Sequence, residues 1–289
     1  MSGVSSLGVT DGQSVATIRA ALDQGINFFD TAYSYGYDGR SDRVLCQALG
    51  QQREQAVIAH KVGTHWDAEK QRVVDGRPEI LMKHAQECLK RLETDYVDVI
   101  YLHCPDPKVP IEESAGAIAE ICRRGWARHA GVSNVTLDQA AKFAAICPIV
   151  AIQPYFNLFQ QDAVEELLPF AIQSNVSMVC YWVLMKGLLS GRLTRDHVFD
   201  PADRRLNYPI FQGKAWQDAQ DDLDQLRRIA NEIDITVAQL VVAWSLTRPG
   251  VSVALLGAKR PEQITDSVQA MYMKLAPECL QEIEEKISS

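Results

Sequence analysis

Three apolar stretches of this sequence end in polar side chains that are able to do chemistry together. The stretches are GINFFDTAYSYG (25–36), AVIAHK (56–61) and YVDVIYLHC (96–104), and the side chains are Asp30, Tyr35, Lys61 and His103. A phenol is a poor acid at neutral pH, but a neighbouring ammonium stabilises the phenolate and lowers its pKa. Together with a carboxylate and an imidazole, such a pair indicates proton transfer to a bound molecule.

These residues meet only if the three stretches are neighbouring parallel strands. The carboxyl ends of parallel strands lie side by side, so residues about thirty positions apart in the chain can converge on one ligand. Strand and helix patterns do alternate along this sequence, without a linker rich in proline, glycine or serine. That rhythm is typical of an α/β protein with a parallel sheet.

We count seven strands, which begin near residues 26, 56, 96, 128, 149, 177 and 251, and the first element is a helix. A TIM (β/α)8 barrel begins with a strand. We therefore predict an α/β TIM barrel in a single domain over residues 1–289, with its first strand missing or atypical. The ten residues before Asp11 have too few apolar side chains to supply a clear strand. We also expect a polar loop over 62–77, a long insertion over 186–215 and a last helix from Pro261.

Composition excludes several functional classes. The chain has 289 residues, is 47% hydrophobic and has a formal net charge of −8, which argues against nucleic acid as a partner. No apolar run approaches the ~18 residues of a membrane span, and the N-terminal residues lack a signal-peptide pattern. Seven scattered cysteines without a CxxC pair indicate reduced thiols. We expect a cytoplasmic protein without a membrane partner.

Each of the catalytic candidates also has a simpler interpretation. Asp30 is suited to cap a turn, Tyr35 to lie on the surface and Lys61 to be a solvated charge. A metal site has no support, because HxH and HExxH spacings are absent from the remaining histidines, which are His60, His65, His84, His129 and His197. A GxGxxG motif is also absent, so the sequence does not favour a Rossmann fold.

Five motifs in order carry a resemblance to a known family. GINFFDTAYSYG, AVIAHK, YLHCPDP, GVSN and LLGAKRPEQ together resemble the aldo-keto reductase superfamily over about residues 12–275. The resemblance implies a TIM-barrel oxidoreductase that transfers a hydride from NADPH to the carbonyl of an aldehyde or ketone. By position it makes Tyr35 the proton donor, Lys61 and Asp30 its partners, and His103 the residue that orients the carbonyl.

The same resemblance implies the cofactor-binding residues. Ser133, Asn134 and Gln153 would hold the nicotinamide carboxamide, and Tyr181 would stack on the nicotinamide ring. Lysine and arginine before a helix start, as in LLGAKRPEQ, suit the 2′-phosphate of NADPH. The remaining cofactor positions implied by the resemblance are Trp182, Leu184, Lys186, Gly187, Gly257, Lys259, Gln263 and Asp266.

The sequence departs from the family pattern in two regions. Trp182 and Val183 replace a frequent small residue and proline, and Met185 and Ser267 stand where glycine and asparagine are common. The N-terminal hairpin and the first barrel strand are not recognisable. An open barrel would expose unpaired edges on the strands at 26–30 and 251–256, which allows two chains to form an oligomer.

Three functions remain open on the sequence alone. The first is a carbonyl reductase, the second a cofactor-binding regulatory subunit with little turnover, and the third a truncated, inactive homologue. The segments 62–77 and 186–215 are the expected walls of a substrate pocket. Aromatic side chains in or near these segments favour an apolar or aromatic carbonyl compound as substrate; they are Trp66, Trp182, Tyr208 and Phe211.

Overall fold

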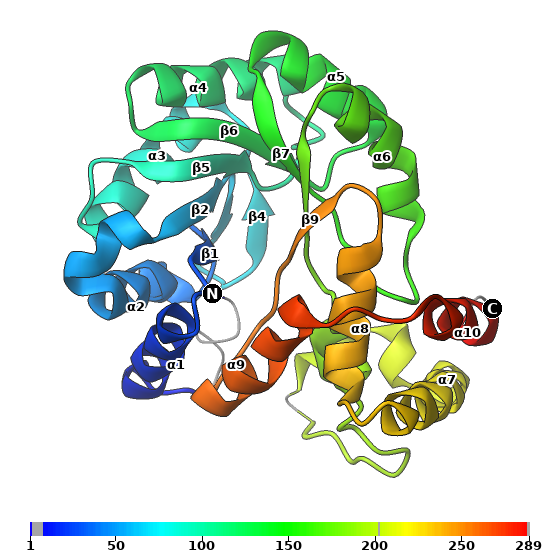
Figure 1. Cartoon of the computed structure of the whole chain (residues 1–289). Helices are drawn as coiled ribbons and strands as arrows, with labels where there is room; N and C mark the ends of the chain where they lie inside the picture. Colours follow the sequence, from blue (N-terminus) through cyan, green and yellow to red (C-terminus); the bar gives the residue numbers. More distant parts are fainter. Residues whose placement is uncertain (2–7, 202, 288–289) are drawn as a thin grey trace.

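The computed structural model describes residues 1, 8–201 and 203–287, and its centre is one curled parallel sheet (Figure 1). Its seven strands lie in the order β1 (Phe28–Ala32), β2 (Val57–Val62), β5 (Val97–Leu102), β6 (Ala127–Ser133), β7 (Ile149–Gln153), β8 (Ser177–Cys180) and β9 (Val251–Ala254). Every neighbouring pair is parallel. The seven predicted strands are therefore confirmed.

The closed eight-stranded barrel is not observed. Among the described residues, β1 pairs only with β2 and β9 only with β8, so the sheet is an open, curled half-barrel. The prediction of a missing first strand concerns the residues before Asp11, and 2–7 lie outside the described part of the chain. The helices come closer to a full circle than the strands do, because α1 (Asp11–Asp23) packs against α9 (Pro261–Val268).

Helices cover the outer face of the sheet (Figure 1). Three of them begin with a capping box, in which threonine and a glutamine three residues later bond to each other's backbone N–H. Among the described residues no single helix is long and apolar enough to span a membrane, although α7 (Gly213–Glu232) and α8 (Val237–Thr247) meet that criterion as a pair bent by 91°. The other helices are α2 (Arg40–Leu49), α3 (Pro78–Leu92), α4 (Ile111–Arg123), α5 (Leu137–Ile146), α6 (Asp162–Gln173), α7 (Gly213–Glu232), α8 (Val237–Thr247) and α10 (Pro277–Ile287).

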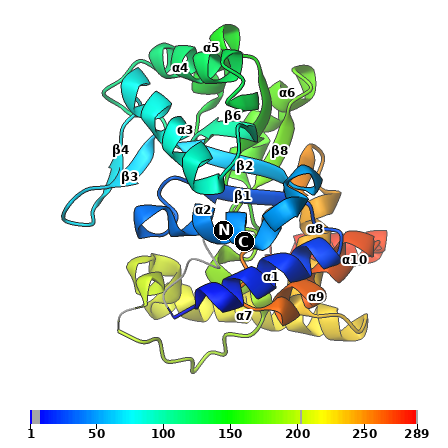
Figure 2. The same ribbon diagram turned by 90° about the vertical axis from the view of Figure 1, so that its left-hand side faces the viewer.

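Two regions differ from the prediction. The expected polar loop over 62–77 contains an antiparallel hairpin of β3 (Thr64–Trp66) and β4 (Arg72–Val74), which projects beside α3 in Figure 2. Its three-residue strands are too short to show a periodic apolar pattern. The helix at Pro261 is not the last one, because α10 follows it.

Short 3-10 helices fill most of the remaining connections. The insertion over 186–215 contains η3 (Met185–Ser190), η4 (Arg204–Asn207) and η5 (Pro209–Phe211). The others are η1 (Tyr37–Gly39), η2 (Gly50–Gln55) and η6 (Gln269–Tyr272). All seven cysteines are free.

The inside of the curled sheet is filled by apolar side chains. Ala59, Val99, Tyr101, Ala151 and Val179 form one buried cluster there. Tyr101 needs a glycine beside it, because a Cβ on Gly131 would lie 2.5 Å from its ring. This packing closes the interior and leaves the carboxyl ends of the strands as the place for polar side chains.

Candidate active site

The structure brings the four predicted catalytic side chains together. Asp30 lies in β1, Lys61 in β2, Tyr35 in the loop after β1, and His103 directly after β5. The Lys61 ammonium lies 2.5 Å from Asp30 Oδ1 and 4.8 Å from the centroid of the Tyr35 ring. The rings of Tyr35 and His103 meet edge to face, with centroids 5.9 Å apart. Parallel pairing of β1, β2 and β5 is what makes these positions neighbours.

Lys61 is held as a buried cation. Burial by itself lowers its pKa, but the Asp30 carboxylate and then Tyr35 offset this effect and raise the pKa above its usual value. The other oxygen of Asp30 accepts a hydrogen bond of 2.8 Å from Gln153 Nε2. The ammonium is therefore fixed in place beside the phenol, as the sequence predicted.

The acidity of Tyr35 differs from the expectation. Burial raises the pKa of this phenol, and although Lys61 lowers it as predicted, the net result lies above the usual value of 10.0. The reason is that a phenolate loses its hydration when it is buried, and here that loss outweighs the field of one ammonium. Tyr35 is consequently a neutral phenol that carries its proton at neutral pH.

His103 is a neutral imidazole. Burial, followed by the charges of Lys61 and Arg72, lowers its pKa well below the usual value. Its Nδ1 lies 2.7 Å from Thr64 Oγ1, which in turn lies 2.9 Å from Ser34 Oγ. When the Thr64 hydroxyl donates to Nδ1, the imidazole carries its proton on Nε2 and is a hydrogen-bond donor there. The sequence reasoning missed Thr64 and Ser34, although both stand in the same strand-end segments as the predicted residues.

Four predicted cofactor residues form a network with the catalytic group. Ser133 Oγ donates to the backbone carbonyl of Gln153 at 2.8 Å, and Asn134 Nδ2 donates to Ser133 Oγ at 3.0 Å. Asn134 has a positive φ of 57°, and its side-chain oxygen accepts a bond of 2.6 Å from the Tyr181 hydroxyl. Since Gln153 also bonds Asp30, the side chains at the ends of β6, β7 and β8 are linked to the Lys61–Asp30 pair.

The segment after β8 follows an irregular path. Positive φ angles occur at Trp182 (63°), Met185 (42°), Lys186 (54°) and Gly187 (92°), and glycine adopts such angles most easily. The glycine that the resemblance implies at position 185 would adopt this angle more easily than methionine does. The Lys186 ammonium lies 4.9 Å from the Trp182 ring and 4.7 Å from the Tyr208 ring. The neighbouring Leu184 is half-buried and packs against the core.

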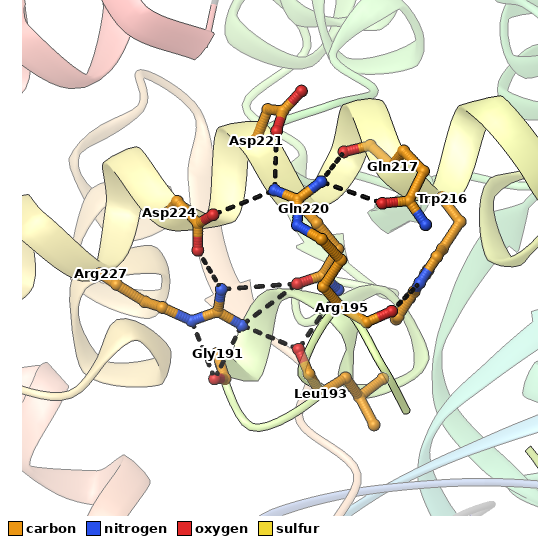
Figure 3. A network of polar contacts seen from close by, with 9 residues as sticks. All are labelled: Gly191, Leu193, Arg195, Trp216, Gln217, Gln220, Asp221, Asp224 and Arg227. Atoms are coloured by element: carbon orange, nitrogen blue, oxygen red, sulfur yellow. Dashed lines mark hydrogen bonds and ion pairs between the residues drawn. The ribbon is translucent and has the colours of Figure 1, made fainter. Parts of the chain in front are cut away.

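The next part of this connection is fastened to α7 (Figure 3). The Leu193 carbonyl accepts hydrogen bonds from Arg227 at 2.8 Å and from Gln220, which is fully buried, at 3.2 Å. Asp224 accepts from Arg227 at 2.6 Å and from Arg195 at 3.1 Å. The first part of the 186–215 insertion is therefore fixed on a helix and is not a free loop.

Two cationic side chains, Lys259 and Arg260, stand just before α9 and are available to bind a ligand. Gln263 Oε1 accepts the backbone N–H groups of Lys259 at 2.8 Å and of Arg260 at 3.2 Å, so this glutamine caps the helix. Asp266 already has a partner, because Arg192 lies 3.5 Å from its carboxylate. Within the described part of the chain, the side chains of Lys259 and Arg260 make no ion pair. The helix N-terminus and these two cations fit an anion such as phosphate.

A buried histidine supports the segment that carries the site. Gly63 donates its backbone N–H to His84 Nδ1 at 3.2 Å, and the Tyr33 ring stacks on His84 with centroids 3.7 Å apart. Burial lowers the pKa of His84 to about 3. In the unfolded chain a histidine takes up a proton below about pH 6.5, so this group stabilises the fold above that pH. The stability is lost as the pH falls from about 6.5 toward 3.

We therefore expect a steeper loss of stability in acid for the wild type than for His84→Gln. The difference should reach about 1.4 kcal/mol per pH unit below about pH 6. Urea unfolding at pH 7, 6 and 5 measures it, and the variant controls for all other titrating groups. Equal pH slopes for the two proteins would show that His84 does not stay neutral in the fold.

Comparison with known proteins identifies similar proteins over most of the chain. The model of the aldo/keto reductase family matches residues 2–288. The chain is 36% identical over 260 residues to the aldo-keto reductase YhdN of Bacillus subtilis, covering 89% of this chain and 78% of the relative. It is 32% identical to a probable voltage-gated potassium channel subunit beta of Arabidopsis thaliana, covering 94% and 86%.

Solved structures give the same result. The glycerol dehydrogenase AKR11B4 of Gluconobacter oxydans superposes with a TM-score of 0.91 at 33% identity, over 99% of this chain and 88% of that chain. The holo form of the aldo-keto reductase AKR11C1 of Bacillus halodurans superposes with a TM-score of 0.80 at 26% identity, over 98% and 90%. The family model, the sequence relatives and the solved structures thus agree, and the chain belongs to the aldo/keto reductase family of oxidoreductases.

Proposed function

We propose that this protein reduces the carbonyl group of an aldehyde or ketone to an alcohol, with NADPH as reductant and Tyr35 as proton donor. One observation carries the proposal, namely that a protonated phenol lies against a buried Lys61–Asp30 ion pair and edge to face with a neutral His103. These groups suit a reaction in which negative charge develops on an oxygen atom.

Each residue has a defined part in the reaction. His103 Nε2 donates a hydrogen bond to the carbonyl oxygen and orients it. The Tyr35 hydroxyl gives its proton to that oxygen as the C–O group gains charge, and the Lys61 ammonium stabilises the phenolate that remains. Asp30 keeps Lys61 charged and in position. Solvent then returns a proton to Tyr35.

The residues at the strand ends are suitable for a nicotinamide cofactor, which supplies the hydride when it is bound. Ser133, Asn134 and Gln153 present an organised set of amide and hydroxyl groups beside the catalytic residues. Gln153 Oε1 makes no hydrogen bond within the described part of the chain, so it is open to accept one from a carboxamide. Lys259 and Arg260 would bind the 2′-phosphate that distinguishes NADPH from NADH.

Titration of the purified protein with NADPH and with NADH tests this proposal, with cofactor fluorescence as the readout. We expect saturable binding that favours NADPH, and consumption of NADPH when an aldehyde is added. Lys259→Gln should weaken NADPH binding by about 10-fold and leave NADH binding unchanged, because only NADPH carries the extra phosphate. A folded, monodisperse protein that binds neither cofactor would refute the proposal.

A second candidate is a cofactor-binding subunit with little turnover. It is favoured by the relatives in Arabidopsis thaliana, Oryza sativa and Schizosaccharomyces pombe that are named as probable or putative potassium channel β subunits. Binding of NADPH without measurable reduction across a broad panel of aldehydes and ketones would support this second candidate over the first.

A further inference from the structure

The hairpin of β3 and β4 presents one face to the candidate active site. Thr64 lies opposite Val74, and Trp66 lies opposite Arg72. Side chains of directly opposed residues point to the same side of a hairpin, and alternate residues of a strand share a side. Thr64, Trp66, Arg72 and Val74 therefore lie on one face.

Contacts of two members of this face show where it points. Thr64 Oγ1 lies 2.7 Å from Nδ1 of His103, and Trp66 Nε1 donates a bond of 2.7 Å to the carbonyl of Ser34, the residue before Tyr35. His65, on the opposite face, lies against His84 outside the site, with ring centroids 5.5 Å apart. Arg72 thus stands on the side of the hairpin that faces the catalytic residues.

The Arg72 side chain is exposed, and within the described residues it makes no hydrogen bond or ion pair. Its charge nevertheless acts on the catalytic groups. Burial raises the pKa of Tyr35 and Arg72 opposes that effect, whereas burial lowers the pKa of His103 and Arg72 lowers it further. A guanidinium with this placement is available to a ligand that lies on Tyr35 and His103.

Two more cations, Lys70 and Arg204, lie beside the aromatic rings of Tyr37 and Trp66. The Lys70 ammonium lies 5.3 Å from the ring of Tyr37, and Arg204, from the far segment η4, donates to the Tyr37 hydroxyl at 3.0 Å. The Arg204 guanidinium also lies 5.8 Å from the Trp66 ring. In the described part of the chain neither cation pairs with a carboxylate. Arg72, Lys70 and Arg204 together form a positive rim beside the candidate active site, although the whole chain has a net charge of −8.

Two acidic residues of this region, Asp38 and Asp67, already have partners. Asp38 pairs with Arg43 at 3.2 Å, and Asp67 accepts the backbone N–H of Gln71 at 2.7 Å within the hairpin turn. Glu69 stands at the exposed tip of the hairpin. The positive charge at the rim is consequently left for a ligand.

We propose that Arg72 binds a carboxylate that the substrate carries at some distance from its carbonyl group, with the body of the substrate packed on Trp66. The substrate class is then aromatic or apolar aldehydes and ketones that bear a carboxylate. A guanidinium binds a carboxylate with two parallel hydrogen bonds, which also fixes the direction in which the carbonyl points. This assignment rests on the proposed carbonyl reduction and names its substrate.

A pair of probes of nearly equal shape tests the assignment. Para-carboxybenzaldehyde carries the carboxylate, and para-formylbenzamide replaces it with a neutral amide. In the wild type we expect the acid to have the higher kcat/KM. Arg72→Gln should lower kcat/KM for the acid by about 10- to 100-fold, mainly through KM, and change it by less than about 2-fold for the amide.

Control variants separate this site from general electrostatics. Lys142→Gln removes one positive charge from the outer helix α5, where Lys142 pairs with Asp138 at 2.7 Å, and it should affect neither probe. Arg72→Lys keeps the positive charge but removes the planar guanidinium that can make two parallel hydrogen bonds. It should give an intermediate loss of kcat/KM for the acid. An equal effect of Lys142→Gln and Arg72→Gln on the acid would overturn the assignment.

Binding measured by calorimetry keeps this test independent of turnover. We expect the wild type with NADP⁺ present, which has no hydride to transfer, to bind para-carboxybenzaldehyde more tightly than the neutral para-formylbenzamide, and Arg72→Gln to lose this preference. Equal affinities in the wild type, or a preference that survives in the variant, would overturn the role of Arg72. Failure of the wild type to reduce either aldehyde would instead refute the proposed carbonyl reduction.

Discussion

Tyr35→Phe is expected to lower kcat for carbonyl reduction by about 10²- to 10⁴-fold, the usual contribution of a positioned general acid. The substitution removes only the hydroxyl, so the ring remains against Lys61 and His103. Because no cofactor contact is lost, the affinity for NADPH should stay the same. Steady-state kinetics with an aldehyde, together with titration by cofactor fluorescence, measures both quantities.

Tyr33→Phe is the matched control for this experiment. Tyr33 lies two residues before Tyr35, but its hydroxyl bonds Glu87 at 2.5 Å and its ring stacks on His84, away from the catalytic group. Loss of this hydroxyl should leave kcat within about 2-fold of the wild type, because Tyr33 has no part in proton donation. Full activity in Tyr35→Phe would show that another group supplies the proton.

Lys61→Met is expected to have the second large effect, on stability as well as on activity. It leaves the Asp30 carboxylate without its cation at a site where Lys61 is fully buried, and breaking a buried pair in this way costs about 3–5 kcal/mol. It also removes the charge that opposes the high pKa of Tyr35, so kcat should fall by at least about 10²-fold. Urea unfolding and kinetics at the same pH measure the two effects.

The double variant Asp30→Asn with Lys61→Met separates stability from catalysis. Removing both charges abolishes the unpaired carboxylate, so the double variant should recover much of the lost free energy of unfolding. Its activity should not recover, because no ammonium remains beside the phenol. Lys214→Met, at a lysine that is 88% exposed, should cost less than about 0.5 kcal/mol. Recovery of activity in the double variant would contradict the role assigned to Lys61.

The open edge of the sheet does not conflict with these predictions. Asp30, Lys61 and His103 belong to β1, to β2 and to the end of β5, which pair with one another inside the described structure. Their geometry depends on these three neighbouring strands and on Tyr101, which fills the interior beneath them. The strands that carry the residues proposed for proton donation therefore pair with one another within the described part of the chain.

The sequence by itself determined the strand pattern and the principal site residues. Apolar runs and the polar side chains that follow them are local features, and parallel order makes their ends neighbours. For this reason the seven strands, and the meeting of Asp30, Tyr35, Lys61 and His103, were predictable. Helix starts such as that at Thr136 were also predictable in kind, because a capping box involves residues only three positions apart.

Tertiary structure alone decided how these residues behave and what surrounds them. The high pKa of Tyr35 depends on burial by many distant side chains, which no local pattern records. The contact of Thr64 with His103 and the position of Arg72 depend on a hairpin whose strands are too short to be periodic. The anchoring of Leu193 by Arg227 joins residues 34 positions apart. Such contacts arise from packing between elements, and so only the folded chain defines them.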